Sequence, residues 1–155
     1  MLFSLGPYKY QFGVRGAGWT ECRGIRMRSH GKLFAATALI EVGAGLVLVS
    51  LPGLAIWLLL GVLEPSTEAL IVGRVGGSAL LAIGVACWFA RDDEGSRSQH
   101  GLLWAMLVYN VGACAVLAFA GWVLSKPGIA LWPGVGLHGI MMIWCALNLA
   151  NARTA

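Results

Sequence analysis

The chain has 155 residues, of which 58% are hydrophobic and only 12% are charged, and its formal net charge is +4. An average globular domain carries about 25% charged residues. A soluble protein of this length could not hide so much apolar sequence, because polar side chains must still cover its surface. The composition therefore excludes an ordinary soluble domain and predicts an integral membrane protein.

Four apolar segments are each long enough to cross the hydrocarbon core of a bilayer, which takes about 20 helical residues. Of the 11 basic and 7 acidic residues in the chain, only Glu41 and Arg74 lie inside these segments. Short connections between them favour an all-α integral membrane fold, with four transmembrane helices in an up-and-down bundle. The expected spans are 33–51, 70–90, 102–124 and 129–150, forming a transmembrane domain of 33–150 between a basic N-terminal tail of 1–32 and a C-terminal tail of 151–155.

The N-terminal tail is rich in glycine and basic residues and has no clear helical or strand period. Met27 begins a short basic stretch that runs directly into the first span. One hypothesis is that Met27 is the native start, which the intact mass of the natively expressed protein would test. The alternative is an amphipathic tail, or one that contacts a partner.

The connections contain residues that interrupt or begin helices. Pro52-Gly53 ends the first span, and the apolar stretch 54–63 is too short to cross, so we expect it to form a short interfacial helix. Ser66 and Thr67 precede Glu68, which is typical of a helix start. Residues 91–100 form a polar loop, and 126–128 form a tight turn.

The basic residues lie mostly on one side of the predicted bundle. The opposite side carries only Lys126, together with two glutamates. This asymmetry is the positive-inside rule, and it predicts a multi-pass protein of the inner (cytoplasmic) membrane with both termini in the cytoplasm. The positive charge therefore indicates topology and lipid contact, with no nucleic-acid partner expected. The nine basic residues on the predicted cytoplasmic side are Lys9, Arg15, Arg23, Arg26, Arg28, Lys32, Arg91, Arg97 and Arg153.

Small residues indicate how the helices pack. Gly73 and Gly77 form the small-xxx-small pattern that lets two helix backbones touch in lipid. The pattern serves packing within one bundle, which we favour, or contact with a second copy or another membrane protein. The cysteines form no C-x-x-C pair and are expected to pack as small apolar residues. The glycines expected on close-approach faces are Gly43, Gly45, Gly73, Gly76, Gly77, Gly134, Gly136 and Gly139.

Several polar residues fall near the middle of the predicted spans. At about 1.5 Å per residue, Glu41 lies ~12 Å from the cytoplasmic end of its span and His138 lies ~13 Å from the outer end of its own. Tyr109 and Asn110 fall at ~10–13 Å by the same rise. Arg74 lies nearer the outer end, although its long side chain can reach inward. Because hydrocarbon drives polar groups inward, the sequence predicts one buried layer of Glu41, Tyr109, Asn110 and His138, with Arg74 above it.

Two interpretations of this layer remain open. It can be structural, with Glu41 paired to Arg74 or His138 so that the helix register is fixed. It can instead be a ligand-binding site for a proton, an ion or an amphipathic molecule, in which Glu41 and His138 titrate and Arg74 holds an anionic or carbonyl group.

The sequence has no pattern typical of an enzyme. One histidine and one glutamate are too few ligands for a metal cage, and no second histidine lies at matched depth for a bis-histidine haem. No catalytic residue, metal or other cofactor is therefore predicted.

Two parts of the chain resemble known families. The segment LIEVGAG at 39–45 resembles the first helix of small multidrug resistance transporters, and this implies that Glu41 is a proton-coupling acid. The chain departs from that family in its interfacial insert and in placing Arg74 and His138 inside the membrane.

The second resemblance covers nearly the whole apolar part: GRVGGSALLAIGVACWFAR, then LLWAMLVYNVGA, then LWPGVGLHGIMMIWC. These segments resemble small four-span bacterial membrane proteins that are loosely DoxX-like. The resemblance implies the same architecture and a meaningful polar layer, but no activity. The positions it carries over are Arg74, Trp88, Tyr109, Asn110, Trp132, Pro133 and His138.

The sequence thus favours a small non-enzymatic membrane protein that acts as an accessory or assembly subunit of a membrane complex. The alternative is a proton-coupled transporter, or a protein that binds a small quinone-like molecule, through Glu41, Arg74 and His138.

Overall fold

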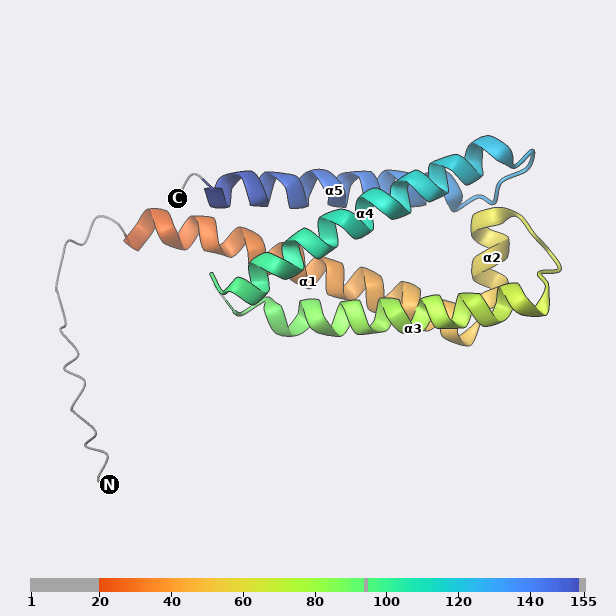
Figure 1. The fold of residues 1–155 in the computed structure, drawn as a ribbon, viewed down its shortest axis with the longest axis horizontal. Coiled ribbons are helices and arrows are strands. Elements are labelled where there is room, and N and C mark those ends of the chain that lie inside the picture. The colour runs from red at the N-terminus through yellow and green to blue at the C-terminus, as the bar shows by residue number, and fades with distance from the viewer. Residues whose placement is uncertain (1–19, 94, 154–155) are drawn as a thin grey trace, which may run out of the picture.

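The computed structural model describes residues 20–93 and 95–153, and these residues form an all-helical fold without strands (Figure 1). Four helices are long and apolar enough to cross a membrane, over Gly31–Ser50, Thr67–Ala90, Arg97–Val123 and Leu131–Asn151. They indicate a multi-pass membrane protein, as the sequence predicts. The five helices are α1 (Thr20–Ser50), α2 (Pro52–Leu60), α3 (Thr67–Ala90), α4 (Arg97–Val123) and α5 (Leu131–Arg153).

The helices extend beyond the apolar segments that predict them. α1 begins at Thr20, inside the tail that shows no clear helical period in the sequence, and α4 begins five residues before the expected span. The reason is that hydropathy marks only the part of a helix suited to hydrocarbon. Backbone hydrogen bonds continue the helix past that point at little extra cost once it is nucleated. Residues 1–19 of the predicted tail and 154–155 lie outside the described residues.

Local chemistry explains where the helices begin and end. The Ser66 hydroxyl accepts a hydrogen bond from the Ala69 amide at 3.3 Å and caps α3, as expected for this segment. Pro52 begins α2, because its missing N–H costs nothing in a first turn. Gly61 ends α2 with a φ of 74°, a left-handed conformation that favours glycine. The short helix therefore spans 52–60 rather than the expected 54–63.

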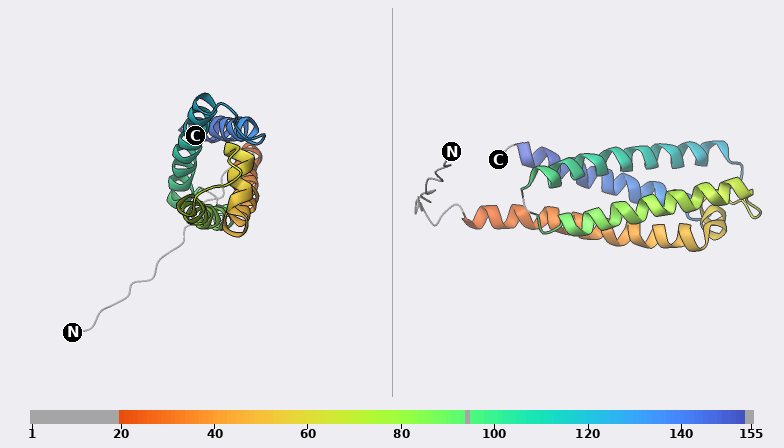
Figure 2. Two further views of the ribbon diagram at one scale, coloured as in Figure 1. Left: turned by 90° about the vertical axis from the view of Figure 1, so that its right-hand side faces the viewer. Right: turned by 60° about the horizontal axis from the view of Figure 1, so that its bottom comes forward.

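The four long helices form two tight pairs. α1 packs along α3 and α4 packs along α5, whereas contacts between the pairs are few (Figures 1 and 2). Gly45 and Gly77 face each other between α1 and α3, and a Cβ added to Gly77 would lie 2.9 Å from the Gly45 carbonyl oxygen. A Cβ at Gly73 would lie 3.4 Å from the Cβ of Pro52. The Gly73-x-x-x-Gly77 pattern therefore packs within the chain.

The prediction that the glycines lie on close-approach faces is confirmed only in part. A Cβ at Gly134 would touch Leu117 at 3.4 Å, so this glycine also lies in a close contact within the chain. Four others make no close contact within the part of the chain described here, because no atom of a neighbouring helix lies within 4 Å of a built Cβ, so for these the prediction of close approach stays untested. These glycines are Gly43, Gly76, Gly136 and Gly139.

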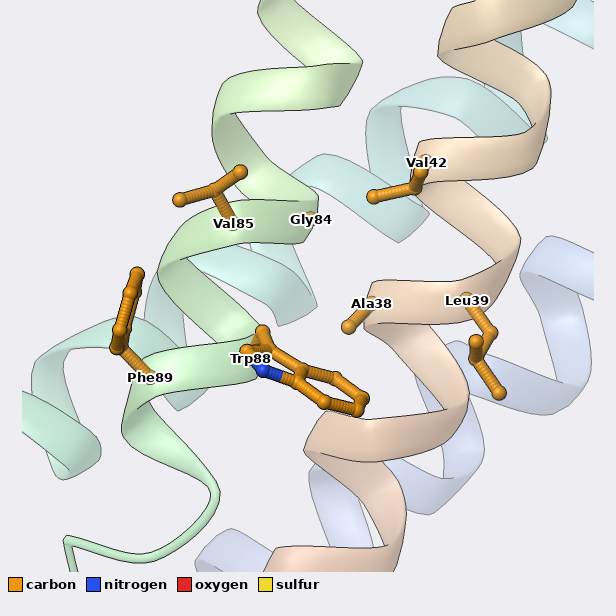
Figure 3. Close-up of a pocket in the computed structure, with 7 residues that line it drawn as sticks. All are labelled: Ala38, Leu39, Val42, Gly84, Val85, Trp88 and Phe89. Atoms are coloured by element: carbon orange, nitrogen blue, oxygen red, sulfur yellow. The ribbon is translucent and has the colours of Figure 1, made fainter.

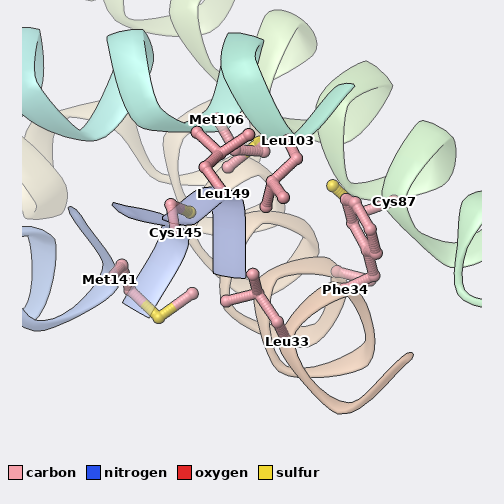
Figure 4. Close-up of a cluster of buried hydrophobic side chains, with 9 residues drawn as sticks. Leu33, Phe34, Cys87, Leu103, Met106, Met141, Cys145 and Leu149 are labelled. Carbon is pink, nitrogen blue, oxygen red and sulfur yellow. The ribbon is translucent and has the colours of Figure 1, made fainter. Parts of the chain in front are cut away.

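An apolar core joins the two pairs at the end of the bundle where α1 begins and α5 ends (Figures 1 and 4). Phe34 of α1 lies at its centre without measurable exposure. Cys87 of α3 and Cys145 of α5 are equally buried there, so these two cysteines pack as small apolar residues, as predicted. The remaining members are Leu33, Ala38, Leu103, Met106, Met141 and Leu149.

At the opposite end α2 lies across the bundle and joins α1 to the turn before α5 (Figure 1). The amides of Gly128 and Ala130 donate hydrogen bonds to the carbonyls of Leu59 and Leu58, at 3.1 and 2.9 Å. The backbone of Gly128 also lies directly against the Leu58 carbonyl, where no side chain fits. The two helix pairs are therefore held together at both ends. The position of α2 at a membrane interface stays a prediction.

The loop between α3 and α4 is held by Gln99, whose side chain is buried. Its Nε2 donates to the Ala90 carbonyl at 2.9 Å, and its Oε1 accepts from the Gly95 amide at 3.2 Å.

Gln99→Ala is expected to lower the free energy of unfolding by about 1–3 kcal/mol, because two backbone groups lose their partner. Thermal unfolding in detergent measures this effect. Ser98→Ala, at an exposed neighbouring position, is the control and should leave stability unchanged.

Candidate functional site

Three helices bring polar side chains together between the two pairs. Glu41 comes from α1, Tyr109 and Asn110 come from α4, and His138 comes from α5. We call these four residues the polar cluster. Each lies on a helix that is otherwise apolar at this level, so its side chain turns toward the other polar groups rather than toward lipid. The sequence predicts this convergence, and the structure brings the four residues together.

One hydrogen bond in the polar cluster joins the two helix pairs. The Tyr109 hydroxyl donates to Oε2 of Glu41 at 3.1 Å. The Glu41 side chain is only 4% exposed, and Tyr109 is half-buried. This bond connects α1 with α4. Tyr109 therefore links the pairs at mid-height, between the apolar core and α2.

The second half of the polar cluster joins α4 to α5. Nδ2 of Asn110 donates to the Met106 carbonyl at 2.8 Å, and this bond fixes the amide with its oxygen toward His138. Oδ1 of Asn110 lies 2.9 Å from Nδ1 of His138. Since an amide oxygen can only accept, the imidazole must carry its proton on Nδ1. The rings of Tyr109 and His138 meet edge to face, with centroids 5.6 Å apart at 83°.

Two polar atoms of the polar cluster have no hydrogen-bond partner in this network, and we call them open. Oε1 of Glu41 and Nε2 of His138 make no hydrogen bond with any residue that the structure describes. With Nδ1 protonated, Nε2 of a neutral imidazole is an acceptor. An acceptor without a partner costs free energy in an apolar environment, so both atoms have reason to bind a further group. The polar cluster can thus hold a small hydroxyl-bearing molecule or water.

Arg74 does not join the polar cluster. Its side chain lies on the exposed side of α3, and its Nε donates to the Val49 carbonyl at 3.4 Å. The neighbouring Gly73 faces α1 and α2. Since successive residues are turned by about 100° on a helix, Arg74 points in a different direction from Gly73. The predicted pair between Glu41 and Arg74 is therefore wrong, as is the alternative pair with His138, because Glu41 binds Tyr109 instead.

Thr37 is a buried polar residue that our sequence interpretation missed. Its side chain is 1% exposed, and its hydroxyl has no hydrogen-bond partner in the part of the chain described here. Thr37 precedes Glu41 by four residues, so both lie on the same face of α1. That spacing was available in the sequence, but a threonine alone in an apolar helix is too common to single out.

The side chains of the polar cluster are a carboxyl, a phenol, an amide and an imidazole. Among the described residues, no three His, Cys, Asp or Glu side chains lie close enough to hold a metal ion. The thiol of Cys114 donates to the Val135 carbonyl at 3.7 Å, away from Glu41 and His138. The arrangement offers a carboxyl, a phenol and an imidazole within one apolar bundle, which suits binding or proton exchange. Comparisons of this chain with protein-family models, with curated proteins and with solved structures give no match.

Proposed function

We propose that this chain is a multi-pass membrane protein that binds a small amphipathic molecule between its two helix pairs, at the polar cluster. The observation that carries the proposal is the pair of open acceptors, Oε1 of Glu41 and Nε2 of His138. Such atoms are expensive to leave unpaired in an apolar environment. The small number of contacts between the helix pairs supports access for a ligand.

The chemistry of the open atoms defines the ligand class. An ionised Glu41 and Nε2 of His138 both accept, so they require a partner that donates hydrogen bonds, and the head group should carry hydroxyl groups, as a quinol does. The apolar side chains of α1, α4 and α5 around it suit a hydrocarbon tail. Arg74 takes no part in this proposal, because its side chain is exposed and its Nε donates to the Val49 carbonyl rather than to a residue of the polar cluster.

A short-chain quinol, decylubiquinol, tests the proposal with purified protein in nanodiscs. At a concentration of 100 times its dissociation constant, a ligand of the native state adds about 2.7 kcal/mol to the free energy of unfolding. We expect a matching rise in the melting temperature of the wild type. Its di-O-methyl ether, which has no donor, should give no shift.

Glu41→Gln is expected to weaken quinol binding about tenfold or more, because the amide oxygen still accepts from Tyr109 while the open oxygen becomes an NH₂ group. His138→Ala should have a similar effect. The matched controls are Glu68→Gln and His100→Ala, at exposed positions outside the polar cluster. A wild type that responds equally to quinol and ether, or not at all, would contradict the proposal, as would full binding by Glu41→Gln.

An accessory or assembly subunit is the second candidate, and the uncovered glycines favour it. Gly136 and Gly139 lie on α5, and no neighbouring helix among the described residues comes within 4 Å of a Cβ built on them, so a partner helix could approach closely there. Gentle detergent extraction should then recover a stoichiometric partner, and Gly136→Leu should release it. Gly101→Leu, another uncovered glycine near the start of α4, is the matched control.

We place the chain in the inner membrane, with both termini in the cytoplasm. The start of α1 and the end of α5 lie at the same end of the bundle (Figure 1), which supports termini on one side. The distribution of basic residues supports the cytoplasmic side. The resemblance to DoxX-like membrane proteins is part of this proposal and adds no activity to it.

A further inference from the structure

A groove runs along the outer face of the pair formed by α1 and α3, away from the polar cluster. It has a volume of about 270 Å³ and is lined by apolar residues of both helices (Figure 3). Ala38 and Val42 line it from α1, and Gly84, Val85 and Trp88 line it from α3. All these residues belong to the two segments that are apolar enough to cross a membrane. The groove therefore faces the hydrocarbon.

The groove exists because two small residues meet where the helices cross. A Cβ added to Gly84 would lie 2.7 Å from Cγ2 of Val42 and 3.1 Å from the Ala38 carbonyl oxygen, so the backbones are close together here. Larger side chains on either side, Leu39 and Phe89, are 69% and 76% exposed and project past this contact. These two side chains form the sides of the groove, and the close contact between α1 and α3 forms its base.

Two basic residues, Arg91 and Lys32, lie at one end of the groove. The guanidinium of Arg91 stacks on the Trp88 ring, with Cζ 3.5 Å from the ring centroid. Lys32 is exposed on α1, seven residues before Leu39 and therefore on the same face. Gly31 lies against the backbone of Arg91, since a Cβ there would be 3.0 Å from its carbonyl oxygen. The two cations thus come from adjacent parts of α1 and α3.

Acidic residues follow Arg91 in the chain, and Asp92 contacts its guanidinium. Oδ2 of Asp92 accepts from Nε of Arg91 at 3.0 Å, and the Asp92 side chain is 80% exposed. This bond uses one of the five N–H groups of the guanidinium. The two terminal nitrogens of Arg91 make no hydrogen bond to the described residues, so they are available to a phosphate group in bidentate geometry.

We propose that the groove holds an acyl chain of an anionic phospholipid, whose phosphate group is bound by Arg91 and Lys32. The apolar lining of the groove suits the acyl chain. Arg91 and Lys32 at one end of the groove suit the anionic head group. Trp88 contributes to both, because its ring lines the groove and orients the guanidinium. This site is separate from the polar cluster and does not depend on the function proposed for it.

Native mass spectrometry with defined lipids tests this proposal. Protein in mild detergent is titrated with phosphatidylglycerol or phosphatidylcholine of identical chains, and retained lipids are counted. We expect one phosphatidylglycerol to be retained about tenfold more strongly than phosphatidylcholine, since charge-assisted hydrogen bonds to phosphate are strong. Arg91→Gln and Lys32→Gln should each reduce this preference. Arg97→Gln and Lys126→Gln, at exposed positions that do not line the groove, are the matched controls.

Brominated acyl chains locate the bound lipid. Phosphatidylglycerol brominated on its acyl chains should quench the fluorescence of Trp88, which is the part of the tryptophan emission that Trp88→Phe removes. Arg91→Gln should reduce that quenching. Equal retention of both lipids, or a preference unchanged in both Arg91→Gln and Lys32→Gln, overturns the proposal. A stable dimer that Trp88→Ala dissociates also overturns it, because the groove would then be a contact between two copies.

Discussion

Replacing Gly77 with valine is expected to separate α1 from α3 and to destabilise the protein by about 1–3 kcal/mol, the usual cost of overpacking. A Cβ at this position would lie 2.8 Å from the Cβ of Leu48 and 2.9 Å from both the Gly45 carbonyl oxygen and Cγ2 of Val49. The Gly45 oxygen belongs to a helix backbone and cannot move aside as a flexible side chain can. The fraction of SDS that unfolds half of the protein in mixed micelles measures the loss.

The preceding residue in the chain is a matched control for this substitution. Gly76 is also in α3, but nothing lies within 4 Å of a Cβ built on it. Gly76→Val therefore changes helix propensity equally without touching α1. We expect Gly77→Val to be clearly less stable than Gly76→Val. Equal stability of the two variants would show that Gly77 does not make the close contact between α1 and α3.

Asn110→Ala is expected to cost about 2 kcal/mol of stability and to loosen the contact between α4 and α5. Asn110 is 1% exposed, and it bonds both the Met106 carbonyl and the His138 ring. Its removal leaves Nδ1 of His138 without an acceptor and opens a cavity. Because Asn110 also sets the tautomer of His138, the variant should lose the preference for quinol over its ether in the binding assay.

Val111→Ala is the control for the Asn110 variant. Val111 is the next residue of α4 and is 46% exposed on the outer face, so its truncation removes no buried contact. SDS unfolding should leave this variant close to the wild type. If Asn110→Ala is as stable as Val111→Ala and still discriminates quinol from ether, then the bond between Asn110 and His138 contributes neither to the fold nor to the site.

Much of the polar cluster could be predicted from the sequence because hydrocarbon restricts where polar groups can lie. The depth of Glu41, Tyr109, Asn110 and His138 follows from counting residues along apolar helices at a constant rise. The high cost of lipid exposure then turns each one inward. The same argument did not place Arg74 correctly. This residue lies near the helix end, where a long cationic side chain can remain on the outside and extend toward the interface.

Packing details were less accessible to prediction. Gly73 and Gly77 follow a pattern that allows close approach, yet Gly43, Gly76, Gly136 and Gly139 looked equivalent in the sequence and are uncovered within the chain. A glycine permits close packing without specifying a neighbour, so the crossing of α1 and α3 selects which ones are used. The same holds for Gln99, whose role in the loop depends on the position of Ala90 after the chain has turned.

The sequence by itself determined that this is an all-helical chain with four apolar segments able to cross a membrane, because hydropathy and length depend only on local composition. It also determined which polar residues share one depth. Only the tertiary structure decided that the helices form two pairs, that Glu41 binds Tyr109 rather than Arg74, and that a groove opens beside Trp88. These features depend on how each helix is rotated about its axis. That rotation is set by contacts between residues far apart in the chain, and in helices apolar on every side the sequence pattern does not reveal it.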